Sequence, residues 1–483
     1  MVRNLHVVPE LFPLVKTGGL ADVASALPVA LANLGADSRI VVPGYSRVLA
    51  AGGQLETVWT DSNLFRGGPA ALRLGTVPGI GVPVYVLDCP GHFDRPGTPY
   101  LAPDGHDWPD NHLRFAGLCW VAARIALGDA GPWVPEVVHC HDWQAGLVPA
   151  YVAHAPGPRP ATVQTVHNMA YQGVFDRHLF GVLGLPRSSL SVDGLEFYGR
   201  IGYLKAGLFY ADRITTVSRT YAKEIQTPEQ GFGLQGLLRT RAADLIGIVN
   251  GIDERVWDPA RDPHLPRPYG IRDAREGKAA ASAALRERMG LPPGEGGPLF
   301  AVVSRLSWHK GLDLMLEVVD ILSDRGAQLV VLGTGEPALE RAFLLAADAR
   351  PDHLAVRLGY DEQLSHLIQG GADVIAVPSR TEPCGLTQLY GLRYGTLPMV
   401  RRTGGLADTV VNAEPDNIAT GRATGFVFDD ATPEAVAGTI DWVCDVHSDR
   451  EAWRALQRTA MSRDVGWSSP AREYLALYRE LVV

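Results

Sequence analysis

The sequence predicts an α/β protein made of two doubly wound domains, each with a parallel sheet covered by helices on both faces. Short β-branched runs alternate along the whole chain with longer stretches of helical spacing, which is the pattern of parallel strands joined by crossover helices. The length of 483 residues is enough for about two or three domains with full cores. A single small binding module is therefore excluded.

The candidate strands fall into two groups, separated by a stretch of different composition. In the first half of the chain they are 5–8, 39–43, 82–88, 136–142, 161–167 and 213–218. In the second half they are 299–305, 328–333, 354–359, 373–379 and 397–401. Residues 250–296 are poor in periodicity and rich in Pro, Gly and Asp, which indicates a linker and the lead-in to the second domain.

Composition and charge exclude several classes of protein. Hydrophobic residues make up 46% of the chain and charged residues 20%, so global disorder is excluded. The net charge of −9, from 44 Lys and Arg against 53 Asp and Glu, disfavours nucleic acids and anionic membranes as partners. An anionic ligand would need a local basic pocket.

The cysteines and the apolar pattern predict a cytoplasmic protein with no membrane segment. The five cysteines are scattered and form no Cys-x-x-Cys pair, as in a reduced compartment. The N-terminal stretch reaches Pro9 and Glu10 before the apolar core of a signal peptide could form. No stretch approaches about 18 uninterrupted apolar residues, the length that a membrane helix needs.

The hexapeptide Thr-Gly-Gly-Leu-Ala-Asp occurs twice, at 17–22 and at 403–408, each time before a helix-like run. Glycines let the backbone approach a ligand closely, and the N–H groups at the start of a helix favour an anion. A helix entry without a ligand is the alternative. Two copies in two domains favour a shared phosphate site.

Polar side chains follow two candidate strands of the first half. His139-Cys140-His141-Asp142-Trp143 lacks the spacing of a zinc site, so no metal is expected there. Asp142 at the strand end is either a carboxylate of the site or a helix N-cap. His167 and Asn168 end the next strand, and an imidazole and an amide suit hydrogen bonds to sugar hydroxyls.

Two segments of the second half carry the strongest signals. Arg305 and Lys310 lie five residues apart on a strand-to-helix turn, where they could converge on a diphosphate, although a solvated basic turn is the alternative. In the segment 378–388, Glu382 projects a carboxylate and Gly385 allows backbone donors to face a ligand. Cys384 lacks a neighbouring base and is interpreted as a packed thiol.

Missing motifs narrow the choice further. The chain has no Gly-x-x-x-x-Gly-Lys-Ser/Thr phosphate loop and no Gly-x-Ser-x-Gly nucleophile elbow, which excludes P-loop ATPases and α/β hydrolases. The pair Gly333 and Gly335 lacks a third glycine at the spacing of a dinucleotide fingerprint.

The motifs above belong to a longer series that runs nearly from end to end. Its other members are Lys16-Thr17-Gly18-Gly19-Leu20, Ala170-Tyr171-Gln172-Gly173, Asn250-Gly251-Ile252-Asp253, Lys310-Gly311-Leu312-Asp313, and a terminal Trp467 with Tyr474 and Tyr478. With this series the sequence closely resembles bacterial glycogen synthases and plant starch synthases, the ADP-glucose-dependent glucan synthases of glycosyltransferase family 5. One departure is His309, where the family usually has Gln.

The resemblance implies a GT-B fold, in which two Rossmann-like doubly wound domains face each other across a cleft. The first domain would span 1–247 and lie on the acceptor side, and the second would span 248–459 and bind the nucleotide sugar. Helices at 460–483 would return to pack on the first domain.

The resemblance also implies roles for individual residues. Phosphate binding would fall to Lys16, Arg305 and Lys310, with Thr403 and Gly404. The transferred glucose would be surrounded by His167, Asn168, Asn250, Asp142 and Glu382. Tyr360 would pack against adenine, and Asp22 and Tyr100 would lie on the acceptor or sugar side. Further donor-binding positions would be Gly18, Gly19, Cys384, Gly385 and Leu386.

The implied activity is retaining transfer of glucose from ADP-glucose to the non-reducing end of glycogen or a maltooligosaccharide. The catalytic residues would be Glu382, His167, Arg305 and Lys310, with no cofactor and no metal, because the two cations stabilise the departing ADP. Glu382 would act either as a nucleophile or, in front-face attack, by orienting hydroxyl groups beside the His167 carbonyl. Three alternatives remain: a phosphorylase, disfavoured by the scarcity of lysines in the second domain, a UDP-glucose-dependent synthase and a catalytically silent glucan-binding scaffold.

Overall fold

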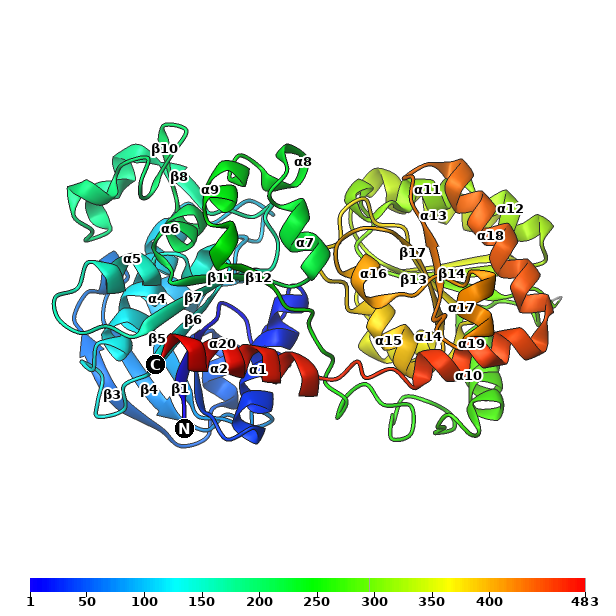
Figure 1. Cartoon of the computed structure of the whole chain (residues 1–483), viewed down its shortest axis with the longest axis horizontal. Helices are drawn as coiled ribbons and strands as arrows, with labels where there is room; N and C mark the ends of the chain where they lie inside the picture. Colours follow the sequence, from blue (N-terminus) through cyan, green and yellow to red (C-terminus); the bar gives the residue numbers. More distant parts are fainter. Residues whose placement is uncertain (295, 483) are drawn as a thin grey trace. The chain divides into compact units, whose positions relative to one another are not determined.

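The computed structural model describes residues 1–294 and 296–482, and these form two compact units (Figure 1). Unit 1 comprises Met1–Asn250 and Trp467–Val483, and unit 2 comprises Gly251–Gly466. The chain thus passes from unit 1 to unit 2 and returns to unit 1 for its last helix. The first crossing follows the expected boundary at 247 by three residues. The return at Trp467 comes seven residues after the expected start at 460, so 460–466 belong to unit 2.

In the described part of unit 1, nine strands form one sheet in the order β12-β11-β7-β6-β1-β2-β5-β4-β3. Neighbours from β12 to β5 are parallel, whereas β4 pairs antiparallel with both β5 and β3. The strands are β1 (Arg3–Val7), β2 (Asp37–Pro43), β3 (Leu55–Asp61), β4 (Ala70–Gly75), β5 (Val84–Asp88), β6 (Val137–His141), β7 (Ala161–Val166), β11 (Arg213–Thr216) and β12 (Leu245–Gly247). A separate antiparallel sheet contains β8 (Val174–Asp176), β9 (Glu196–Phe197) and β10 (Arg200–Gly202).

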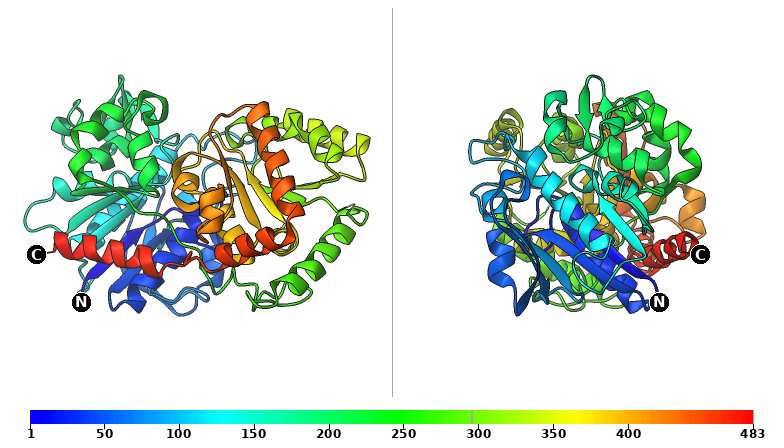
Figure 2. Two further views of the ribbon diagram at one scale, coloured as in Figure 1. Left: turned by 45° about the vertical axis from the view of Figure 1, so that its right-hand side comes forward. Right: turned by 90° about the vertical axis from the view of Figure 1, so that its left-hand side faces the viewer.

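Helices cover this sheet and include the last helix of the chain. The α-helices are α1 (Gly19–Asn33), α2 (Ser46–Ala51), α3 (Pro90–Phe93), α4 (Asn111–Ala126), α5 (Val148–Ala153), α6 (Tyr203–Tyr210), α7 (Arg219–Glu224), α8 (Pro228–Gly231), α9 (Gln235–Thr240) and α20 (Ser468–Leu481). The 3-10 helices are η1 (Leu64–Arg66), η2 (Trp143–Ala145), η3 (Arg177–Val182), η4 (Arg187–Ser189) and η5 (Ala242–Asp244). Helix α20 packs beside α1 (Figure 2). Its Tyr474 and Tyr478 are buried in the core of unit 1.

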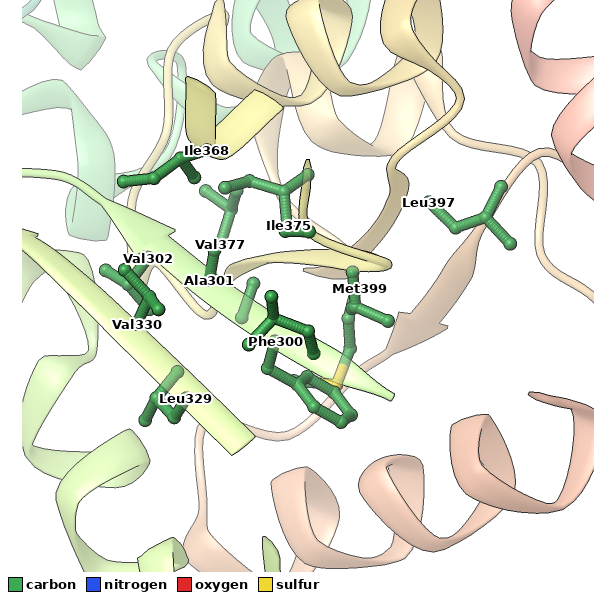
Figure 3. Packing of buried hydrophobic residues seen from close by; sticks show 14 of the residues in the cluster. Phe300, Ala301, Val302, Leu329, Val330, Ile368, Ile375, Val377, Leu397 and Met399 are labelled. Carbon is green, nitrogen blue, oxygen red and sulfur yellow. The ribbon is translucent and has the colours of Figure 1, made fainter. Parts of the chain in front are cut away.

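In the described part of unit 2, six strands form a parallel sheet in the order β15-β14-β13-β16-β17-β18. They are β13 (Leu299–Val303), β14 (Gln328–Gly333), β15 (Leu354–Leu358), β16 (Val374–Val377), β17 (Leu397–Arg401) and β18 (Phe426–Phe428). The helices are α10 (Ala274–Met289), η6 (Trp308–Lys310), α11 (Leu312–Glu317), α12 (Val319–Asp324), α13 (Pro337–Ala349), α14 (Glu362–Gly371), α15 (Thr387–Tyr394), α16 (Gly404–Thr409), α17 (Pro415–Ala419), α18 (Pro433–Ser448) and α19 (Arg450–Met461). Figure 3 shows part of the core, with Phe300, Ile375 and Met399 coming from three neighbouring strands.

Both sheets have the doubly wound order that the sequence predicts. Numbered along the chain, the strands of unit 2 follow the order 3-2-1-4-5-6, which is that of a Rossmann fold. The parallel part of unit 1 follows the same order with one further strand, β12, at its edge. The direction of winding reverses between β1 and β6 in unit 1 and between β13 and β16 in unit 2. Ligands of such sheets bind outside the strand ends at this switch point.

Every strand predicted from the sequence overlaps an observed strand, but some elements were missed. The hairpin of β3 and β4 lies at the edge of its sheet and is only partly buried, so it lacks the buried β-branched runs on which the prediction rested. Helix α10 lies inside the stretch interpreted as a linker. Its alanine-rich sequence was masked by the Pro and Gly residues on either side, and Gly290 ends it with a left-handed φ of 74°.

Local capping fixes several helix starts in unit 2. The Thr432 side chain accepts a hydrogen bond from the amide of Ala435, and Pro433 occupies the first turn of α18. Asp361 caps α14 in the same way through the amide of Leu364. Among the described residues no helix is both long and apolar enough to cross a membrane.

A buried aromatic stack anchors the start of unit 2. The Trp257 ring lies between the rings of His366 and Tyr390, with centroid distances of 3.8 Å to each. Asp262 Oδ2 accepts hydrogen bonds from His366 Nδ1 at 2.7 Å and from the Tyr394 hydroxyl at 2.5 Å. Burial raises the pKa of Asp262, but these bonds outweigh it and hold that pKa below its ordinary value. Burial lowers the pKa of His366, and its bond to Asp262 raises it to above its ordinary value.

These shifts define the pH range over which the pair stabilises unit 2. The stability that Asp262 contributes to folding is present above its unfolded pKa of 3.8. The stability that His366 contributes is complete below its unfolded pKa of 6.5 and is lost as pH rises through the folded pKa of His366. We expect Asp262→Asn to lower the free energy of unfolding by about 3 kcal/mol at pH 6 and by less at pH 9. Urea unfolding at both pH values measures this difference.

Asp441→Asn, at an exposed ion pair with Arg325, is the matched control and should change stability by less than about 1 kcal/mol at either pH. An Asp262→Asn effect that is equal at pH 6 and pH 9 would contradict a charged pair.

Candidate active site

The predicted site residues of unit 2 lie at its switch point. Arg305 follows β13 and Glu382 follows β16, so the two loops start from neighbouring strands. The amide of Arg380 donates to the His309 carbonyl at 2.9 Å. Gly311 has a φ of 68°, and a Cβ there would overlap the Pro378 carbonyl oxygen. The basic turn can therefore approach the Glu382 loop because this position is glycine.

Lys310 and Glu382 form an ion pair at the centre of these loops. Lys310 Nζ lies 2.6 Å from Glu382 Oε2, and the same oxygen accepts a hydrogen bond from the Ser379 hydroxyl at 2.8 Å. Glu382 is 7% exposed and Ser379 is fully buried. The carboxylate thus balances the lysine charge and is held in one orientation. Ser379 was not singled out from the sequence, because its role depends on a contact rather than on a motif.

The second hexapeptide turn packs directly on the Glu382 loop. The amide of Gly405 donates to the carbonyl oxygens of Glu382 and Pro383 at 3.2 and 3.1 Å. A Cβ at Gly404, which has a φ of 44°, would overlap the Glu382 carbonyl oxygen. The glycines of this turn are therefore required by backbone packing, in addition to any role toward a ligand.

The remaining predicted residues of unit 2 differ in how close they lie to these loops. Thr403 is 1% and Cys384 6% exposed, so the thiol is packed as expected. Gly385 has a φ of 71° and precedes α15. Tyr360 follows the edge strand β15 with its side chain 74% exposed, and its hydroxyl donates to Glu362.

In unit 1, a buried carboxylate organises the first hexapeptide turn. Glu10 is 3% exposed, and its Oε2 accepts hydrogen bonds from the amides of Thr17 at 2.5 Å and Gly18 at 3.4 Å. The hydroxyl groups of Thr17 and Tyr100 donate to Glu10 Oε1. Glu10 was missed in the sequence, and its only signal there is its place between a strand end and the glycine turn.

Lys16 and Asp22 of the same turn are paired with each other. Lys16 Nζ lies 3.0 Å from Asp22 Oδ1, and it also lies 4.9 Å from the centroid of the Phe12 ring. The predicted phosphate-binding lysine thus carries a local counter-charge, as Lys310 does in unit 2. Gly18 and Gly19 form the start of α1, where Gly18 is the N-cap residue.

Asp142 holds the main chain at the end of β7. Its Oδ1 accepts hydrogen bonds from the amides of His167 at 2.6 Å and Asn168 at 3.4 Å. Asp142 is the N-cap residue of η2, but among the described residues its carboxylate makes no capping hydrogen bond to that helix. Asp142 has a φ of 56° and a ψ of −167°, a conformation that costs a non-glycine residue energy and is typical of functional sites.

Burial also changes the charge of Asp142. It raises the pKa of this carboxyl to about 7, and the amides of His167 and Asn168 oppose the shift only in part.

Asn250 is the last residue of unit 1 before the chain enters unit 2, and it is 6% exposed. Its Oδ1 is buried and has no hydrogen-bond partner among the described residues.

The structure adds His6 to the two histidines of the Asp142 motif. Ring nitrogens of His6, His139 and His141 lie within 4.8 Å of one another, and all three side chains are buried. Five of their six ring nitrogens already form hydrogen bonds, to one another, to Tyr478, to Thr165 and to His167. A cation here would have to replace most of these bonds, so the donor set does not fit a metal site.

The predicted residues therefore form two sets, one on each unit. Unit 2 brings together the basic turn, the Glu382 loop and the second hexapeptide turn. Unit 1 brings the Glu10-centred turn and the Asp142-centred turn to the ends of β1, β6 and β7. Each set lies at the switch point of its own sheet, where a phosphate or a sugar can meet backbone amides, cations and carboxylates.

Comparison with known proteins accounts for nearly the whole chain. Residues 3–240 match the family described as "Starch synthase catalytic domain", and residues 286–459 match "Glycosyl transferases group 1". The glycogen synthase of Roseobacter denitrificans is 52% identical over 483 residues, covering 100% of both chains. That of Methylocella silvestris is 50% identical over 481 residues, covering 100% of this chain and 99% of the relative.

Solved structures give a consistent result. The catalytic domain of starch synthase IV from Arabidopsis thaliana, bound to ADP and acarbose, matches with a TM-score of 0.89 and 31% identity over 100% of this chain and 99% of that one. A sucrose-phosphate synthase from Thermosynechococcus elongatus matches with a TM-score of 0.60 and 16% identity, covering 100% and 99%, which shows the fold alone.

The raised pKa of Asp142 makes a prediction about stability. The folded pKa of Asp142, about 7, lies above the ordinary value of 3.8. The stability that the protonated carboxyl contributes to folding is therefore complete below about pH 4 and is lost as pH rises through 7. Relative to the wild type, Asp142→Asn should gain about 2–3 kcal/mol of stability between pH 5 and pH 8. Urea unfolding at the two pH values tests this, with Asp176→Asn on the surface of unit 1 as the control. No relative gain would mean that Asp142 ionises like an exposed carboxyl.

Proposed function

The chain belongs to the family of bacterial glycogen synthases and plant starch synthases, which are hexosyltransferases, and we propose that it transfers glucose from ADP-glucose to the non-reducing end of an α-1,4-glucan and releases ADP. Its donor is a nucleotide sugar and its acceptor a glucan. Its two doubly wound units are those of a GT-B glycosyltransferase. The proposal concerns the nucleotide, the acceptor and the roles of individual residues.

The ion pair of Lys310 and Glu382 is the observation that carries the proposal. A lysine and a buried carboxylate lie 2.6 Å apart on two loops, of which the lysine loop also bears Arg305, and the turn of Thr403 and Gly404 packs on the Glu382 loop. Together they supply what a glucosyl diphosphate needs. Arg305 and Lys310 bind the diphosphate. Glu382 balances the lysine charge and orients hydroxyl groups of the sugar.

Unit 1 supplies the acceptor-side and sugar-side residues. His167 and Asn168 offer side-chain hydrogen bonds to sugar hydroxyls, and the Asp142 carboxylate fixes the turn that carries them. Asn250 has a buried amide oxygen that can accept a hydrogen bond from a ligand. Lys16 reaches phosphate once it leaves Asp22, and Gly18 and Gly19 keep the turn open.

The charges explain how transfer is accelerated. As the bond between glucose and phosphate breaks, negative charge grows on ADP and positive charge grows on the anomeric carbon. In the proposed mechanism Arg305 and Lys310 stabilise the negative charge, and each such donor contributes about 3 kcal/mol to catalysis. These residues supply the charge that a divalent metal supplies elsewhere, so the proposal needs no metal and no cofactor. Front-face attack accounts for retention, and in it the Glu382 carboxylate orients the sugar.

The choice of nucleotide rests on family membership and on one structural relative. The Arabidopsis starch synthase structure contains ADP and acarbose, an oligosaccharide analogue, and the exposed Tyr360 ring suits stacking against adenine. We also propose a cytoplasmic location, since all five cysteines lie in the described chain as buried free thiols, which suits a reduced compartment.

The reaction itself is the first test. With ADP-glucose and a maltooligosaccharide primer, the purified protein should release ADP in a coupled assay, and UDP-glucose should give a much lower kcat/KM. Faster turnover with UDP-glucose would overturn the choice of nucleotide. Glucan binding without release of either nucleotide would favour a non-catalytic scaffold.

Glu382 is tested separately from nucleotide binding. Glu382→Gln removes the carboxylate charge but keeps the side-chain size, so kcat should fall by about 100-fold or more. The Kd for ADP should change by less than about threefold, because the cations that bind phosphate remain. Steady-state kinetics and calorimetry measure the two quantities. Glu317→Gln, on the exposed side of α11, is the control. A large loss of ADP affinity in Glu382→Gln would mean that Glu382 holds the nucleotide.

A further inference from the structure

Three histidine rings form a row from the interior of unit 1 to His167. His6 lies on β1, His141 ends β6, and His167 follows β7 directly, so three neighbouring strands place them. His6 Nδ1 lies 3.1 Å from His141 Nε2, and His141 Nδ1 lies 2.9 Å from His167 Nε2. His6 and His141 are fully buried and His167 is partly exposed. We call these residues the histidine row.

The three rings are neutral near pH 7. Burial lowers the pKa of His6 and of His167 to about 3. Burial also lowers the pKa of His141 well below its ordinary value, and the neighbouring histidines add to the effect. A neutral imidazole carries a single N–H and leaves its other nitrogen bare. Each of the two ring-to-ring contacts therefore contains one hydrogen.

Counting hydrogens leaves two possible arrangements for the row. The three neutral rings carry three hydrogens, of which two lie in the contacts. The third must lie at one end, either on His6 Nε2 or on His167 Nδ1. The hydrogen positions of all three rings are thus coupled, because a ring that donates at one nitrogen accepts at the other.

The buried end decides between the two arrangements. His6 Nε2 is buried and has no hydrogen-bond partner among the described residues. An N–H there would be a buried donor without an acceptor, which costs more than a bare nitrogen at the same place. The third hydrogen therefore lies on His167 Nδ1. His6 then donates to His141, and His141 Nδ1 donates to His167 Nε2.

We infer that His141, backed by His6, is a positioning residue that fixes His167 in the tautomer with hydrogen on Nδ1. The row uses His167 Nε2 and leaves Nδ1 as the ring nitrogen available to a ligand. His167 therefore offers its ligand an N–H donor and no acceptor. The inference rests on the proposed function only in taking that ligand to be the sugar or phosphate of the donor.

This tautomer limits what His167 can do in the reaction. An Nδ1–H group can donate to a sugar hydroxyl or a phosphate oxygen, and the hydrogen bond strengthens as that oxygen gains negative charge. It cannot remove the proton from the attacking hydroxyl of the acceptor, because a general base needs a bare nitrogen. This agrees with front-face attack, in which the departing phosphate takes this proton and the His167 ring does not.

The tautomer can be measured without any substrate. Protein labelled with nitrogen-15 in its histidines gives separate resonances for protonated and bare ring nitrogens, and the His167 signals are identified by their loss in His167→Gln. We expect Nδ1 of His167 to be protonated in the wild type. His141→Leu removes the hydrogen bond to Nε2, so signal from the other tautomer should appear. In His141→Asn, the amide nitrogen takes the place of Nδ1 and can donate to His167, which should restore the wild-type tautomer.

Kinetics separate positioning from loss of structure. His141→Leu should lower kcat by about 10- to 100-fold with the KM for ADP-glucose within about twofold, and His141→Asn should recover most of the loss. His139→Leu is the matched control, since His139 is a buried histidine on the same strand and face but bonds to Tyr478 and Thr165. It should destabilise unit 1 without changing the His167 tautomer.

Two results would overturn the inference. One is a wild-type His167 with its hydrogen on Nε2, and the other is a His141→Leu protein that keeps both the wild-type tautomer and the wild-type kcat. Failure of the proposed function has a different signature. A wild-type protein that is inactive with ADP-glucose and UDP-glucose would refute the activity, and the nitrogen-15 spectra would still decide the tautomer.

Discussion

In each unit the chain adds parallel strands to the sheet in opposite directions from one point, and this point determines where chemistry can occur. At the switch between β1 and β6, and again between β13 and β16, neighbouring loops leave the sheet on opposite sides and expose strand ends between them. Most of the predicted functional residues lie on loops that follow these strands or their neighbours, whereas Tyr100, Asn250 and Tyr360 come after β5, β12 and β15. The remaining architecture holds these loops in place: capped helices cover the sheets, α20 returns to the core of unit 1, and glycine positions such as Gly311 and Gly404 allow loops to pack backbone against backbone.

The two lysines proposed to bind phosphate are each balanced by a carboxylate of the same unit. Lys16 pairs with Asp22 in unit 1, and Lys310 pairs with Glu382 in unit 2. This pairing reconciles a chain of net charge −9 with a small anionic donor, because the positive charge is local and is held ready by a partner. The pairing also assigns nucleotide binding and sugar orientation to different side chains. In the proposed mechanism the lysine binds phosphate and the carboxylate orients the sugar.

Residues of a continuous local pattern could be predicted from the sequence, and residues that act through distant contacts could not. The strand ends and glycine turns follow from backbone chemistry within a few residues, which is why Arg305 and the repeated hexapeptide were recognised. Glu10 meets Tyr100 across 90 residues and His6 meets His141 across 135, so neither partner marks the other along the chain. The role of Asp142 stayed ambiguous for the same reason, since its partners are amides that follow the next strand.

The central claim is that this chain builds α-1,4-glucan from ADP-glucose with retention of configuration, and the structure of the product tests it most directly. Maltotetraose incubated with ADP-glucose labelled with carbon-13 in the glucose should yield maltopentaose with the label in the terminal, non-reducing residue. The proton-carbon spectrum should show an α-1,4 linkage for that residue. Label recovered as free glucose, or as a β-linked residue, would contradict the account.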